Sequence, residues 1–191
     1  NNDPRLMIEY DNIIELFETI LEEKEGDESF IIVDLARLGK DTTTISAWKG
    51  LKLLRGRTFK KQRVNITEGI IREWKQEFKT PLKNILIDEV GVGGGLVDNL
   101  KCSGFIANAT AQENPLTKKK ENFASLKAQC AYRLAKAVNN YEIEIPPDAI
   151  NSEDKQTIIE ELSILKTSNK EDKPLDIISK EEMKLILKRS P

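Results

Sequence analysis

The sequence predicts a single α/β domain with a mixed central sheet flanked by helices. Short β-branched apolar runs at 30–33 and 85–87 each end at an acidic residue, as buried strands do. Apolar residues at 70–78 and 123–138 instead recur every three or four positions, which is typical of helices packed along one face. With 191 residues, 39% of them hydrophobic, the chain can bury one such core. We expect residues 1–29 to be a linker and an acidic helix, and residues 30–191 to form the domain.

The individual elements follow from local patterns along the chain. Alternating or β-branched stretches predict strands at 30–33, 42–48, 49–63, 84–88, 105–106, 141–145, 164–167 and 175–178. Helical spacing predicts helices at 11–21, 67–78, 96–100, 123–138, 152–162 and 179–187. Thr67 is the expected N-cap of the second helix, and Ser179 with Glu182 forms a capping box for the last. The second helix should connect two parallel strands by a right-handed crossover.

The composition excludes several kinds of site. The chain has no histidine, and Cys102 and Cys130 are far apart, so zinc sites with Cys or His ligands and Ser-His-Asp triads are ruled out. A site made only of carboxylates suits Mg²⁺ or Mn²⁺. The chemistry that remains is metal-assisted phosphoryl transfer or phosphodiester hydrolysis, in which two ions roughly 3.5 to 4 Å apart hold the attacking and leaving oxygens. No apolar run is long enough to cross a membrane.

Two acids stand at the ends of predicted strands. Asp34 ends the strand at 30–33 and Asp88 ends the strand at 85–87. A carboxylate in such a place needs a compensating cation, which for Asp34 is either a neighbouring Arg37 or Lys40 or a metal ion. Two adjacent strands that end at the same edge would bring both acids to shared divalent cations. We therefore predict Asp34 and Asp88 as metal-binding catalytic residues. The secondary candidates are Asp41, Glu89 and Asp98.

Basic residues gather in two stretches. The stretch 49–63 carries seven of them among apolar residues, which predicts either a positive ridge that binds phosphates or an edge strand protected from aggregation. The second stretch is a lysine triplet at 118–120, which is either solvated surface or a DNA contact. Because the formal net charge is −2, contact with nucleic acid would depend on such local groups. The predicted DNA-binding residues are Arg55, Arg57, Lys60, Lys61, Arg63, Lys118, Lys119 and Lys120.

The glycine-rich segment 91–95 lies between a predicted strand and a predicted helix. Its spacing matches neither a dinucleotide fingerprint nor a P-loop. Either the glycines permit a tight turn behind Asp88 and bring amides near a DNA phosphate, or the turn is purely structural.

Four runs resemble, in order, the C-terminal nuclease domain of large terminase subunits of tailed bacteriophages. They are VDLARLGKDTT (33–43), IDEVGVGGGLVDNL (87–100), ENFASLKAQCAYRL (121–134) and SKEEMKLILKRSP (179–191). The resemblance implies a ribonuclease H-like fold at 30–191 and a metal-dependent endonuclease that cuts concatemeric double-stranded DNA with little sequence specificity. It implies two Mg²⁺ or Mn²⁺ ions, with Asp34 and Asp88 as the first two metal-binding acids. In this family the third acid follows a Ser-Pro pair, and this chain ends at Ser190-Pro191, so we expect a C-terminally truncated fragment of a longer protein.

The same resemblance implies the partners. They are double-stranded DNA, an N-terminal ATPase domain of the same subunit, the portal protein and the small terminase subunit, in the cytoplasm of the infected bacterial host and with no membrane. Two alternatives stay open: a catalytically silent module that docks DNA or portal, and another ribonuclease H-like nuclease such as a resolvase.

Overall fold

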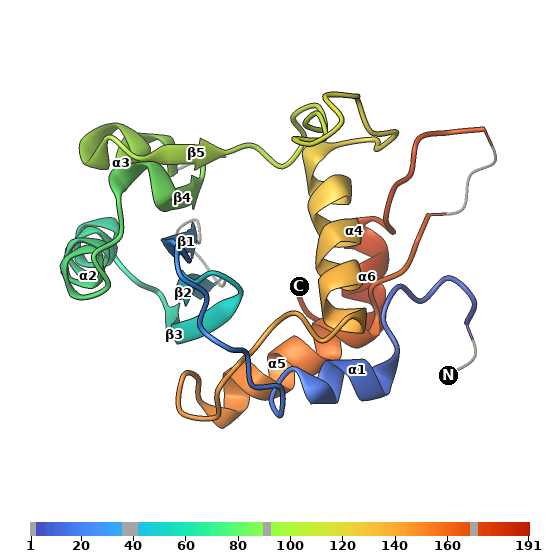
Figure 1. The fold of residues 1–191 in the computed structure, drawn as a ribbon, viewed down its shortest axis with the longest axis horizontal. Helices are drawn as coiled ribbons and strands as arrows, with labels where there is room; N and C mark the ends of the chain where they lie inside the picture. The colour runs from blue at the N-terminus through green and yellow to red at the C-terminus, as the bar shows by residue number, and fades with distance from the viewer. Residues whose placement is uncertain (1–2, 36–41, 90–92, 169–171) are drawn as a thin grey trace. The chain divides into compact units, whose positions relative to one another are not determined.

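The computed structural model describes residues 3–35, 42–89, 93–168 and 172–191 (Figure 1). Contacts within the chain divide it into two units, each of which is assembled from separate segments. Unit 1 comprises Asn1–Leu16, Ala107–Glu142 and Lys155–Pro191, and unit 2 comprises Phe17–Ile106 and Ile143–Asp154. The predicted boundary between residues 29 and 30 stays a prediction.

Unit 2 contains a five-stranded sheet with the order β3-β2-β1-β4-β5. Its strands are β1 (Ser29–Asp34), β2 (Thr42–Lys49), β3 (Lys52–Lys60), β4 (Ile85–Asp88) and β5 (Ser103–Phe105). Strands β1, β2 and β3 pair antiparallel in succession, whereas β4 pairs parallel with both β1 and β5. The mixed sheet predicted from the sequence is confirmed.

Helices α2 (Val64–Glu77) and α3 (Gly93–Leu100) lie on the same side of this sheet (Figure 1). A short 3₁₀ turn, η1 (Leu82–Asn84), precedes β4. The core of the unit is a cluster of buried side chains from the strands and both helices, because α2 and α3 each turn an apolar stripe to the sheet. Its members are Ile31, Val33, Ile45, Ala47, Ile71, Trp74, Ile85, Ile87, Leu96 and Leu100.

Unit 1 is helical. It contains α1 (Tyr10–Glu15), α4 (Leu126–Asn139), most of α5 (Ser152–Ser163) and α6 (Lys180–Leu187). The side-chain amide of Asn139 donates to the Met7 carbonyl at 2.9 Å, and the Asn12 amide donates to Asn139 Oδ1 at 3.0 Å, so these amides join α1 to α4. The predicted capping box of the last helix is present, with Ser179 Oγ accepting from Glu182 N at 3.1 Å. Among the described residues, the helices are all too short or too polar to span a bilayer.

Several elements differ from the sequence prediction. The helix expected over 11–21 ends at Glu15, and Ile20 is 86% exposed. Thr67 is not the cap of α2, which begins three residues earlier; its hydroxyl bonds back to the Arg63 carbonyl at 3.3 Å. The strand expected over 141–145 is reduced to a bridge between Glu144 and Lys52 on the edge of β3. The hairpin expected at 164–178 is reduced to a bridge between Thr167 and Ile177. The two segments of the expected hairpin also bond to other parts of unit 1: Thr167 N donates to the Arg5 carbonyl at 2.9 Å, and Leu175 N donates to the Asn122 carbonyl at 2.9 Å.

Candidate active site

Asp34 and Asp88 stand at the carboxyl ends of neighbouring parallel strands. Ile31 pairs with Ile85 and Val33 pairs with Ile87. One further step along each strand brings Asp34 level with Asp88. Since neighbouring strands are separated by about 4.8 Å, the two backbones at this level are close enough for both carboxylates to serve one site.

The two acids also share a face of the sheet. Ile31, Val33, Ile85 and Ile87 are at most 2% exposed and belong to the core under α2 and α3. Because side chains alternate along a strand, the acids that follow Val33 and Ile87 point to the opposite face, with Asp34 exposed and Asp88 half-buried. The structure thus gathers the two principal candidates in the sheet. Their role as metal ligands stays a prediction.

Two threonines on β2 and β3 lie in one cross-strand row with the acids. Asp34 pairs with Thr44, which pairs in turn with Thr58, and the two threonine Oγ1 atoms are 3.5 Å apart. These hydroxyls are not among the site residues predicted from the sequence. The turn at 50–51 would have indicated the register between β2 and β3, but the bulge between Ala47 and Trp48 shifts that register by one residue.

Because of the same bulge, only part of the predicted basic ridge lies on the face of the sheet that carries the acids. After the bulge, Arg55 pairs with Ala47 and Arg57 pairs with Ile45, and both partners are fully buried under the helices. Residues that pair directly across an antiparallel ladder lie on the same face. Arg55 and Arg57 are therefore on the helix-covered face, opposite the acids.

Both arginines are engaged in contacts that hold the fold together. Arg55 makes a bidentate pair with Glu77, at 2.8 and 2.6 Å, and its guanidinium lies 5.3 Å from the Trp74 ring centre and 5.1 Å from that of Phe78. The hydrogen bond from Arg55 lowers the pKa of Glu77, and the same bond raises the pKa of Arg55. Arg57 Nη1 donates to the carbonyls of Gly56 and Ala149 at 2.6 and 3.1 Å.

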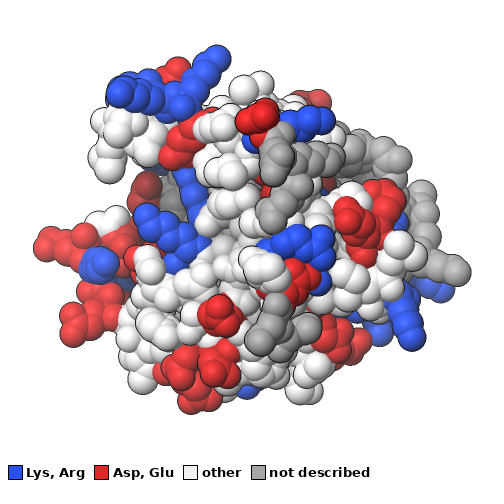
Figure 2. Space-filling model, turned by 90° about the vertical axis from the view of Figure 1, so that its right-hand side faces the viewer, with Lys and Arg blue, Asp and Glu red and all other residues white. Residues whose placement is uncertain are grey.

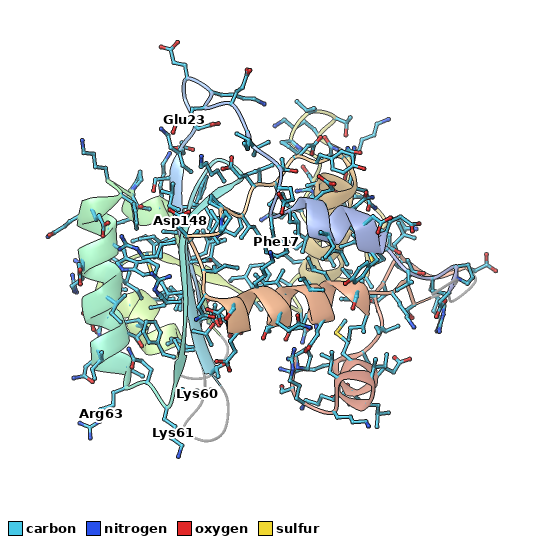
Figure 3. All side chains as sticks on the ribbon, turned by 90° about the horizontal axis from the view of Figure 1, so that it is seen from below. Phe17, Glu23, Lys60, Lys61, Arg63 and Asp148 are labelled. Atoms are coloured by element: carbon cyan, nitrogen blue, oxygen red, sulfur yellow. The ribbon has the colours of Figure 1, made fainter. Side chains whose placement is uncertain are left out.

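The other basic residues of this stretch reach solvent. Lys60 pairs with Thr42, two residues from Thr44 along the same strand, and so lies on the face of the acids. Figure 3 shows Lys60, Lys61 and Arg63 near one another, with Lys61 and Arg63 extended away from the ribbon, whereas Glu23 lies at the other end of this unit. Lys60 makes an ion pair with Glu153 at 3.3 Å, in which both side chains are 75% exposed, so water screens the pair.

Lys118, Lys119 and Lys120 belong to unit 1 and are all exposed. They follow a turn in the loop between β5 and α4, where Glu113 bridges to Lys120. On the face drawn in Figure 2, lysine and arginine side chains occur in small groups among acidic ones. Any contact with a polyanion from this face therefore depends on local groups.

The secondary acids have different surroundings. Asp41 lies outside the described residues, as do Arg37 and Lys40, the alternative salt-bridge partners of Asp34. Glu89 follows Asp88 directly; its amide donates to the Phe105 carbonyl at 3.0 Å, and its carboxylate lies over Gly104 of β5. Asp98 is exposed on α3, the helix that covers the face opposite the principal acids. Glu89 is thus near the candidate site, and Asp98 is not.

The first residue of α3, Gly93, lies directly against the backbone of Asp88. A Cβ on Gly93 would clash with the Asp88 carbonyl oxygen, which only glycine avoids. This close approach supports the structural interpretation of the turn. Gly91 and Val92 lie outside the described residues, and a contact with phosphate stays a prediction.

The donor set fits a hard divalent cation. Two carboxylates at one level, joined by water and substrate phosphate oxygens, are the ligands that Mg²⁺ and Mn²⁺ prefer. Within the described ranges, no group of three Asp, Glu, Cys or His side chains is arranged to hold an ion. Asp34 and Asp88 are the two described residues that would hold such an ion.

Comparison with known proteins identifies the fold. No family model matches the sequence, and no curated protein is significantly similar to it in sequence. Among solved structures, the K428A mutant nuclease domain of the large terminase subunit gp2 of bacterial virus Sf6, solved with manganese and beta-thujaplicinol, superposes with a TM-score of 0.79 at 16% identity, over 97% of this chain and 93% of that one. A K428A mutant of gp2c of the same large terminase subunit, solved with calcium, has the same TM-score and identity.

A second solved structure is more distant. The large terminase nuclease from thermophilic phage G20c, with bound magnesium, has a TM-score of 0.59 at 12% identity, over 93% of this chain and 89% of that one. These matches span almost the whole chain and share its mixed sheet flanked by helices. The chain therefore has the ribonuclease H-like fold of the nuclease domains of phage large terminase subunits.

Proposed function

We propose that this domain is a divalent-metal-dependent endonuclease of a phage DNA-packaging terminase, cutting concatemeric double-stranded DNA with little sequence specificity. The observation that carries the proposal is the pair Asp34 and Asp88, level on adjacent parallel strands and on one face. The fold match and the metals named in the matched structures support it.

In this proposal the residues of the chain hold and orient the reactants. The carboxylates of Asp34 and Asp88 would hold two Mg²⁺ or Mn²⁺ ions. Bound ions would supply Lewis acidity at the scissile phosphate and a nucleophile at neutral pH. Thr44, opposite Asp34, offers a hydroxyl donor on the same face, and Lys60, Lys61 and Arg63 bind phosphates away from the cut, which positions the duplex without reading its bases.

The wider context is also part of the proposal. The domain would act in the cytoplasm of the infected host, joined to an ATPase domain and working with the portal protein and the small subunit.

Plasmid nicking with Mn²⁺ tests the proposal. We expect Asp34→Asn and Asp88→Asn to lower the rate by more than about 10- to 100-fold, since even outer partners of a metal site cost that much. Mn²⁺ binding, followed by electron paramagnetic resonance, should weaken in parallel.

Glu23→Gln is the matched control, because it removes one carboxylate at the other end of the same unit (Figure 3). It should leave both the cleavage rate and Mn²⁺ binding unchanged. If the protein leaves plasmid intact with both Mg²⁺ and Mn²⁺, the proposal is wrong and a catalytically silent docking module replaces it.

A further inference from the structure

The loop between β5 and α4 ends in an ordered tip, residues 113–120. Asn114 organises this tip: its Oδ1 accepts from Leu116 N at 2.9 Å and from Thr117 N at 3.1 Å. Its backbone carbonyl accepts from Lys118 N at 2.8 Å, and its backbone N–H donates to the Lys119 carbonyl at 2.9 Å. The backbone that carries the lysines is therefore held by hydrogen bonds before any partner arrives.

The base of the tip is fixed to α4 by a buried amide. Gln129 is 1% exposed; its Nε2 donates to the Gln112 carbonyl at 2.9 Å and to Glu121 Oε2 at 2.6 Å, and its Oε1 accepts from Gln112 N at 2.8 Å. Glu121 also accepts from Asn114 and Arg133, and the hydrogen bonds from Gln129, Asn114 and Arg133 lower its pKa. With its buried amide fully bonded, Gln129 fixes the base of the tip to α4.

The tip presents cations and one apolar side chain to solvent. Lys118, Lys119 and Lys120 are exposed, and within the described part of the chain none of them makes an ion pair with an acid. Leu116 is 91% exposed, the largest exposed fraction among the large hydrophobic residues described. Lys60, by contrast, has a carboxylate partner.

We propose that the tip at 113–120 is a preformed contact for the backbone of duplex DNA. The three lysines bind phosphates, and Leu116 packs against the apolar sugar edge of a groove. Preordering lowers the entropy cost of binding, because the backbone that carries the lysines is already fixed. The choice of DNA as the polyanion depends on the proposed function; the rigid cationic tip does not.

Binding of a short fluorescein-labelled duplex, followed by anisotropy over a range of NaCl concentrations without divalent ions, tests the inference. Each phosphate contact contributes about 0.9 to the slope of log K against log salt. Replacing Lys118, Lys119 and Lys120 with alanine should therefore reduce that slope by about 2 to 3. The matched control replaces Lys180, Lys184 and Lys188 of the same unit with alanine, which removes the same charge and should leave the slope unchanged.

A second variant tests the ordering of the tip separately from the charge of its lysines. Asn114→Ala keeps every lysine but removes the acceptor that shapes the tip, so affinity should fall about 2- to 10-fold while the slope stays the same. Circular dichroism and thermal melting check that each variant is folded. Equal slopes for the two lysine triples would overturn the DNA contact, as would displacement of the duplex by polyglutamate as effectively as by unlabelled duplex. Unchanged affinity in Asn114→Ala would overturn the preordering.

This experiment is independent of cleavage. If the wild-type protein fails to cut plasmid but the tip variants lose binding, the nuclease proposal fails and the tip contact stands. If it cuts plasmid and the two lysine triples behave alike, the nuclease proposal stands and the tip contact fails.

Discussion

Gly93, the first residue of α3, leaves no space for a side chain. A Cβ there would clash with the Asp88 carbonyl oxygen and would lie 2.8 Å from its carbonyl carbon. Real Cβ contacts are essentially never below 3.0 Å, so Gly93→Ala must push the start of α3 away from the end of β4. Both contacts are with backbone, which has less freedom to move than a flexible side chain. We expect the free energy of unfolding to fall by about 1 to 3 kcal/mol, the usual cost of overpacking.

The displacement should also affect the candidate site, because the atoms that must move belong to Asp88 itself. Mn²⁺-dependent nicking should fall by more than the loss of folded protein accounts for. Urea unfolding, interpreted with a constant m value, measures the first effect, and initial nicking rates at a temperature where the variant is folded measure the second.

The two following glycines are internal controls. A Cβ on Gly94 would make ordinary contacts at 3.7 and 3.9 Å with Glu89, and a Cβ on Gly95 would meet nothing within 4 Å. Alanine favours a helix interior over glycine, so Gly95→Ala should stabilise the protein by about 0.5 to 1 kcal/mol. If Gly93→Ala proves as stable and as active as Gly95→Ala, the close packing of α3 on Asp88 is refuted.

Three further predictions concern unit 2. Arg55→Ala should lower the free energy of unfolding by about 1 to 2 kcal/mol from its two ring contacts, measured by urea titration; an unchanged midpoint would contradict this. Because Arg55 lowers the pKa of Glu77, Glu77 binds fewer protons in the folded than in the unfolded state. The stabilisation that ionised Glu77 adds to the folded state is therefore present at neutral pH and is lost as the pH falls below about 4.5. Glu77→Gln should accordingly make the free energy of unfolding depend less on pH on the acid side. Lys52→Met leaves the carboxylate of Glu144, which is 5% exposed, without the ammonium 3.0 Å away, and should cost about 1 to 3 kcal/mol in the same titration. Adding Glu144→Gln should recover part of that loss, and a double variant no more stable than Lys52→Met alone would refute the pairing.

Local patterns were sufficient for the parts of the fold that depend on short-range chemistry. The apolar runs at 30–33 and 85–87 form β1 and β4, and the capping box at Ser179 forms as expected. These elements bury continuous apolar segments or satisfy their own end groups, so their identity depends little on distant residues. The helix expected over 11–21 is a different case. It stops at Glu15, and beyond it Leu21 N donates to the carboxylate of Glu144, a distant residue.

The faces of β3 could not be predicted in the same way. Counting from the turn at 50–51 without a bulge would pair Thr44 with Arg57, which would place Arg57 beside Asp34. The bulge at Ala47 and Trp48 instead pairs Thr44 with Thr58 and places Arg57 on the buried face. A shift of one residue reverses every side chain of a strand, and nothing in the sequence of β3 alone indicates it.

By itself, the amino-acid sequence determined that this chain has strands ending in Asp34 and Asp88 and no histidine or cysteine site to compete with them. Only the tertiary structure decided that these two strands are neighbours, parallel and in a register that brings the acids level, and that hydroxyls rather than guanidinium groups extend their row. The physical reason is that strand composition depends on local burial, whereas strand order and register depend on long-range backbone hydrogen bonds and on which face packs under α2 and α3.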